Sequence, residues 1–179
     1  MIRLITFFVF FLTLQINCNG QSFFNYTDTV FEVGQIRRIE VTYQLSGGCG
    51  PRIESLPILD SIYNFLEMNK NLKIEIGVHT DCRSDSMFNV EISNMRARKV
   101  EGYLIEKGID TNRMEYKGYG ENDPKTVDSE INRMYPFLTI GQKLTEEFIK
   151  KLDTVEKQEI AHMLNRRTEI KIIEISNRP

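Results

Sequence analysis

The residues best suited to chemistry lie in one polar segment and on the helix predicted to follow it. The segment reads His79-Thr80-Asp81-Cys82-Arg83-Ser84-Asp85-Ser86. Asn89, Ser93 and Arg96 follow at spacings of four and three, so they share one face of a helix. Asp81 could accept hydrogen bonds from an ammonium, while Arg96 could bind a carboxylate through two hydrogen bonds. These two charges would suit the zwitterionic end of an amino acid, although spacing alone leaves open an internal Asp81–Arg96 ion pair or solvated loop charges.

Two other chemistries use the same residue types. Cys82, His79 and Asp81 could form a thiol hydrolase, but nothing in the sequence marks an orienting base within reach of the thiol. Cys49 together with the same three residues has the ligand types of a zinc site, yet it lacks paired Cys-x-x-Cys or histidine spacing. The sequence also has no glycine-rich phosphate loop. It therefore favours a binding protein without a metal or cofactor over an enzyme.

Alternating strands and helices are expected to position these residues. Apolar residues alternate with polar ones from Leu72 to Val78, which predicts a strand directly before the polar segment. A helix is expected from about Asn89 to Gly108. Further strands are predicted near 39–43, 114–120 and 170–175, helices at 55–66 and after Thr145 and Asp153, and a long loop over 121–144. The order β-α-β-α-β-α-β predicts an α/β two-layer sandwich with helices packed on a mixed four-stranded sheet.

Length and charge limit the function classes. The chain has 179 residues, a size that fits one domain plus an appendage. Its 23 basic and 25 acidic side chains give a net charge of -2, which argues against a strongly basic nucleic-acid binder. Charged residues make up 27% and hydrophobic residues 41%, values typical of a folded globular domain.

The appendage is predicted to be a secretory signal over residues 1–20. Arg3 precedes an apolar run from Leu4 to Leu14, which is too short to cross a membrane but suits a signal peptide. Two processing routes stay open, namely cleavage after Gly20 and a lipoprotein signal ending at a lipidated Cys18. Residues 21–35 are expected to form a linker.

Five ordered motifs resemble the OmpA C-terminal-like domain, the peptidoglycan-binding module of the OmpA/MotB/Pal type. The resemblance spans roughly Ile36 to Ile175, and the domain is assigned to residues 36–179. The motifs are 74–81, 89–97, 108–110 with Arg113, 118–121 with Pro124, and 165–169. Five motifs in family order are far more specific than any one of them.

The resemblance implies non-covalent binding of peptidoglycan through the diaminopimelate of its stem peptide, which would link the outer membrane or periplasm to the cell wall. Asp81 would bind the ligand's amino group and Arg96 its carboxylate, while Thr80, Asn89 and Arg166 complete the site. The protein would be exported to the periplasm or to the periplasmic face of the outer membrane. A lipid or a partner protein would provide any membrane attachment.

An alternative keeps the fold but not the ligand site. The family commonly has a Phe-Asp-type pair at the end of the first strand, before the loop. This sequence instead reads Tyr43-Gln44-Leu45 and then Gly47-Gly48-Cys49-Gly50, so the acidic residue is missing. The domain would then act only as a protein–protein assembly module of the cell envelope.

Two features outside these motifs carry further expectations. Removal or acylation of Cys18 leaves Cys49 and Cys82 as an even pair in an oxidising compartment, and we hypothesise a disulfide between them at the rim of the site. Residues 122–143 exceed the minimal domain, and the apolar run from Met134 to Leu138 is expected to pack as a satellite cluster rather than bind a partner.

Overall fold

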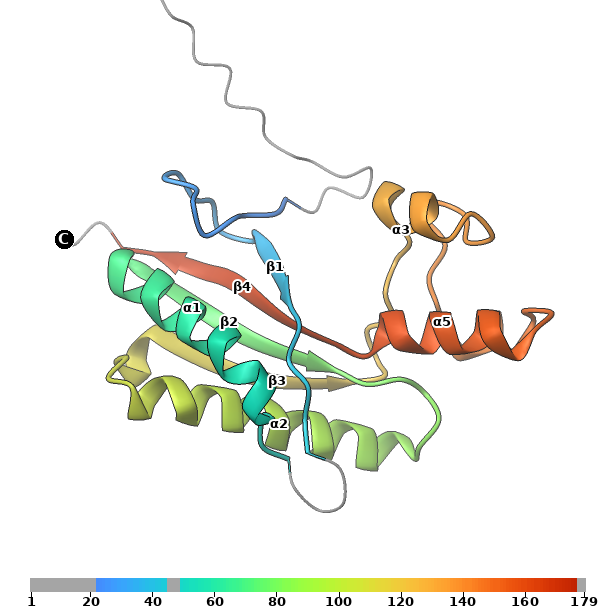
Figure 1. Ribbon diagram of the computed structural model, residues 1–179, viewed down its shortest axis with the longest axis horizontal. Helices are drawn as coiled ribbons and strands as arrows, with labels where there is room; N and C mark the ends of the chain where they lie inside the picture. The colour runs from blue at the N-terminus through green and yellow to red at the C-terminus, as the bar shows by residue number, and fades with distance from the viewer. Residues whose placement is uncertain (1–21, 45–48, 177–179) are drawn as a thin grey trace, which may run out of the picture.

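The computed structural model describes residues 22–44 and 49–176 and contains a mixed four-stranded sheet (Figure 1). The strands lie in the order β1-β4-β2-β3, with β2 parallel to β3 and β4 antiparallel to both β1 and β2. Their bounds are Ile36–Ile39 for β1, Leu72–His79 for β2, Met114–Gly120 for β3 and Arg167–Ile175 for β4. The predicted α/β sandwich with a mixed four-stranded sheet is confirmed.

Two long helices cover one face of this sheet. They are α1, Leu56–Met68, and α2, Ser86–Glu106, and Figure 1 shows both on the same side. The alternating apolar residues of β2 point toward them, and Leu72, Ile74, Ile76 and Val78 are all buried. Because successive strand residues face opposite sides, this pattern fixes the register of the strand that ends at the polar segment.

A second helical unit lies beyond the end of the sheet at which β2 stops (Figure 1). It comprises α3, Ser129–Met134, α4, Glu146–Lys150, and α5, Val155–Asn165. Its own buried cluster includes Val127, Ile131, Leu138, Leu144, Ile149, Ala161 and Leu164. The predicted satellite cluster is therefore present, but Leu138 is its buried member and Met134 stays 53% exposed.

The segment expected to be a long loop, 121–144, contains a short helix. The Asp128 side chain caps α3 by accepting a hydrogen bond from the backbone N–H of Ile131 at 2.9 Å. Asn165, the last residue of α5, joins this helix to two other segments of the unit, because it donates to the Leu144 carbonyl at 2.8 Å and accepts from the Lys125 N–H at 2.9 Å.

The first strand lies earlier than the sequence predicts. Hydrogen bonding to β4 covers Ile36–Ile39, whereas Tyr43 forms only an isolated bridge with Pro51. The segment expected to be a linker also packs, because Phe24 is buried and its ring stacks on Phe65 at 5.2 Å. The predicted signal over residues 1–20, with Cys18, lies outside the described residues.

Candidate functional site

The polar segment forms the connection from the end of β2 to the start of α2. Asp85 ends this connection and caps α2, because its carboxylate accepts from the N–H groups of Met87 and Phe88 at 2.9 and 3.2 Å. The helix thus begins at Ser86, slightly earlier than predicted. The connection places Thr80 and Asp81 at the carboxyl end of a strand, where α/β folds commonly bind ligands.

Asp81 is largely buried, and its carboxylate forms hydrogen bonds with two arginines. Its Oδ2 accepts from Nη2 of Arg83 at 2.7 Å and from Nη1 of Arg166 at 2.5 Å. Burial would raise the pKa of Asp81, but the hydrogen bonds from these arginines outweigh it and lower the pKa to about 2. The carboxylate is therefore ionised at neutral pH.

Two of the predicted ligand-binding residues have a buried polar atom without a partner. Oγ1 of Thr80 and Nε of Arg96 have no hydrogen-bond partner among the described residues. The Arg96 guanidinium lies over the Tyr43 ring at 4.9 Å, and the Tyr43 hydroxyl is 2.9 Å from Oγ1 of Thr168. Thr168 pairs with Val78 in the sheet, so Arg96 is held near the end of β2 but is not bonded to Asp81. Buried polar groups are rarely left unpaired, and those that are call for an explanation such as a functional role.

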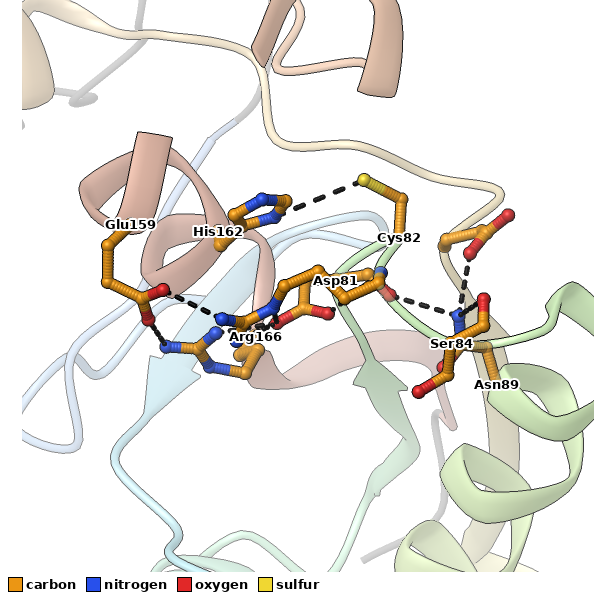
Figure 2. Close-up of polar contacts among 9 residues, drawn as sticks. Asp81, Cys82, Ser84, Asn89, Glu159, His162 and Arg166 are labelled. Carbon is orange, nitrogen blue, oxygen red and sulfur yellow. Dashed lines mark hydrogen bonds and ion pairs between the residues drawn. The ribbon is translucent and has the colours of Figure 1, made fainter. Parts of the chain in front are cut away.

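Asn89 braces the polar segment from inside. Its side-chain amide donates to the Asp81 carbonyl at 3.0 Å and to the Glu121 carboxylate at 2.6 Å, and it lies 3.2 Å from the Ser84 carbonyl. Figure 2 shows Asn89 reaching from α2 toward this segment. These bonds fix the backbone that presents Asp81, which is a positioning role.

Helix α5 supplies one side of the site. Glu159 and His162 on α5, together with Arg166 directly after it, point toward Asp81 and Cys82 (Figure 2). Glu159 bonds both Arg83 and Arg166 at 2.8 Å, so two carboxylates share two arginines. Arg83 and Glu159 were not among the site residues predicted from the sequence. One signal was available, because Glu159, His162 and Arg166 are spaced by three and four and so share a helix face.

The predicted Cys49–Cys82 disulfide is wrong, because the structure has both residues as free thiols. The Cys49 sulfur lies 4.0 Å from Sδ of Met95, whereas the Cys82 sulfur lies 4.0 Å from Nδ1 of His162. Met95 sits about 13 Å along α2 from its start, while Cys82 precedes that start. The two thiols therefore contact side chains on different helices, α2 and α5, and no bond joins them.

His79 and Cys82, which the hydrolase and zinc alternatives share, contact other residues in the structure. His79 stacks on Tyr119 with ring centroids 4.5 Å apart and lies 3.4 Å from Glu169 and 3.6 Å from Asp123. Burial, together with nearby Glu146, raises the pKa of the Cys82 thiol, which disfavours the thiolate a nucleophile requires.

The buried ion pairs predict a loss of stability in acid. Burial would raise the pKa of Glu169, but His79 and Arg167 lower it to about 2, as the arginines do for Asp81. Carboxylates with lowered pKa values stabilise the fold above their unfolded pKa, and this contribution disappears as the pH falls from about 4 to 2. We expect each to contribute roughly 2 kcal/mol, measured by urea unfolding across this range.

A matched pair of variants isolates this effect. Glu169→Gln should flatten the fall in unfolding free energy below pH 5, whereas Glu174→Gln, an exposed change on the same strand, should leave the wild-type slope. Equal slopes for wild type and Glu169→Gln would contradict the assignment.

Comparison with known proteins identifies the domain. Residues 54–135 match the model of the OmpA family. These residues form an OmpA family domain. Its fold is similar to that of the periplasmic domain of Helicobacter pylori MotB, with a TM-score of 0.52, 18% identity, and coverage of 79% of this chain and 83% of that one.

Curated relatives of the OmpA family domain include two Haemophilus influenzae proteins. Outer membrane protein P5 is 35% identical over 68 residues, which is 38% of this chain and 19% of P5. Peptidoglycan-associated lipoprotein is 32% identical over 74 residues, which is 41% of this chain and 48% of the relative. The chain thus matches less than half of the length of either relative. No helix in residues 22–44 and 49–176 has the length and apolar character needed to cross a membrane.

Proposed function

We propose that this OmpA family domain binds peptidoglycan non-covalently, by recognising the free zwitterionic end of diaminopimelate in the stem peptide. The observation that carries the proposal is the buried Nε–H of Arg96, which lacks a partner among the described residues. A ligand carboxylate would satisfy it, and Oγ1 of Thr80 could donate to the same group. The ligand's ammonium would then contact the ionised Asp81.

This chemistry involves binding alone. A carboxylate–guanidinium contact and an ammonium–carboxylate contact select a zwitterion through charge and geometry, without breaking a bond. Relatives named Outer membrane protein P5 and Peptidoglycan-associated lipoprotein support a place in the cell envelope. The domain would connect the periplasm or outer membrane to the cell wall, and lipidation at Cys18 or a partner protein would provide any anchor.

Competition against isolated sacculi tests the proposal. The purified protein should co-sediment with sacculi, and free diaminopimelic acid should release it. Pimelic acid has the same carbon chain and both carboxylates but no amino groups, so it should release far less. Failure to co-sediment, or equal release by the two acids, would contradict recognition of the zwitterion. The first of these results would favour the assembly-module alternative.

A further inference from the structure

The carboxylate proposed to hold the ligand's ammonium is already occupied. Besides Nη1 of Arg166, Oδ2 of Asp81 accepts from Nη2 and Nε of Arg83 at 2.7 and 3.1 Å, and Oδ1 accepts from the Arg83 backbone N–H at 3.1 Å. Arg83 therefore folds back on Asp81 from two residues further along the chain. A ligand ammonium cannot take this position while the Arg83 side chain remains there.

Arg83 also pairs with a second carboxylate, and this pair can remain when Arg83 leaves Asp81. Its Nη1 is 2.8 Å from Oε2 of Glu159, whose other oxygen is 2.8 Å from Nη2 of Arg166. The side chain of Arg83 is 50% exposed, whereas that of Asp81 is 11% exposed. Arg83 can therefore leave Asp81 for water and Glu159 without becoming an unpaired buried charge.

Arg166 is the less exposed of the two arginines and lies between two regular elements. It caps the end of α5 and directly precedes β4, so both flanking elements fix its backbone. Its side chain is 38% exposed. Arg83 lies in an irregular connection and has the more exposed side chain. We therefore expect Arg83, rather than Arg166, to leave Asp81 when a ligand ammonium binds.

We propose that Arg83 competes with the ligand's ammonium for Asp81, and that Glu159 retains Arg83 when the ligand displaces it. This inference rests on the proposed function. The exchange leaves each of the two carboxylates with two cationic neighbours, because the ammonium replaces one guanidinium at Asp81. A neutral ligand group cannot make this replacement, so Arg83 restricts the site to ligands with a free cationic group.

Titration calorimetry with a diaminopimelate-containing stem tripeptide tests the competition. Two forms of the tripeptide are compared, in which the amino group at the free end of diaminopimelate is either unmodified or acetylated. Arg83→Gln should bind the free-amine peptide about three- to tenfold more tightly than wild type, because the fraction of sites blocked by Arg83 disappears. The gain should be absent with the acetylated peptide. Arg98→Gln, an equal charge change at an exposed position of α2, should bind like wild type.

Glu159→Gln should change affinity in the opposite direction. Without Glu159, Arg83 loses its alternative acceptor and stays on Asp81, so the free-amine peptide should bind about threefold or more weakly. In the Arg83→Gln background the same change should have little effect on affinity. Thermal unfolding of each variant checks that the domain remains folded.

The outcomes separate this inference from the function on which it rests. Wild-type binding with an unchanged or weakened Arg83→Gln variant would overturn the competition and leave the proposed function standing. An equal gain for the acetylated peptide would also overturn it. Absence of binding by both wild type and Arg83→Gln would overturn the proposed function, and the competition with it.

Discussion

Replacing Arg96 by glutamine is expected to lower the affinity for peptidoglycan sacculi by roughly ten- to hundredfold. The change removes the buried Nε–H and the charge proposed to bind the ligand carboxylate, which would then be left desolvated without its partner. Removal of one partner of a charged hydrogen bond typically costs about 1.5–3 kcal/mol. Co-sedimentation with sacculi over a range of protein concentrations measures the change.

The same helix offers a matched control. Arg98 is exposed and lies two residues further along α2, so Arg98→Gln removes an equal charge and should bind sacculi like wild type. Equal loss in both variants would indicate a general charge effect, and retention by Arg96→Gln would refute the site. Asp81 is less suitable for this test, because its removal also breaks the ion pairs that it forms with Arg83 and Arg166.

Alanine at Gly118 is expected to destabilise the domain by about 3 kcal/mol or more, because overpacking against backbone cannot be relieved by side-chain movement. A Cβ at Gly118 would lie 2.1 Å from the backbone nitrogen of Asn94 and 2.5 Å from Oγ of Ser93. The Gly118 N–H also donates to Oδ1 of Asn94 at 2.7 Å. Relief of the clash requires α2 to move away from β3. Urea unfolding measures the loss.

Gly102→Ala is the control for this prediction. Gly102 lies within α2, and a Cβ there would meet no heavy atom within 4 Å. Alanine should therefore stabilise the helix by about 0.5–1 kcal/mol through its higher helix propensity. A Gly118→Ala variant as stable as wild type would contradict the close approach of α2 and β3. Because α2 contains Asn89 and Arg96, the Gly118→Ala variant, in which α2 is displaced, should also bind sacculi more weakly.

The sequence predicted the elements around the site well because burial produces regular patterns. The alternation from Leu72 to Val78 exists because one face of β2 lies against the helices. Ala97, Val100 and Leu104, which are spaced by three and four along the predicted helix, are likewise fully buried. Local patterns of this kind depend only on which face is covered.

The prediction of the fold failed where the pattern of apolar residues does not come from packing in the sheet, or where an element is too short to show a pattern. Val41 and Tyr43 are partly buried against the core, but the backbone there does not continue the β1 ladder, so alternation placed the first strand too late. Helix α3 was missed because its six residues are too few to show a helical repeat.

Long-range contacts explain what the sequence left out of the site. Asp81, Asn89 and Arg166 were predicted, and hydrogen bonds join them. Glu159 lies 76 residues from Arg83 in the chain, so only the packing of α5 reveals their contact. The disulfide was mispredicted for the same reason, since sequence places Cys49 and Cys82 at one end of the sheet without showing that they contact different partners.

The most direct test of the central claim observes the Nε–H of Arg96 during binding. Its NMR signal can be assigned by its loss in Arg96→Gln and followed while the diaminopimelate stem tripeptide is added. We predict that the Arg96 Nε–H resonance moves downfield and saturates with the tripeptide, as expected for a new hydrogen bond to a carboxylate. A resonance that stays unchanged while the tripeptide saturates the protein would contradict the account.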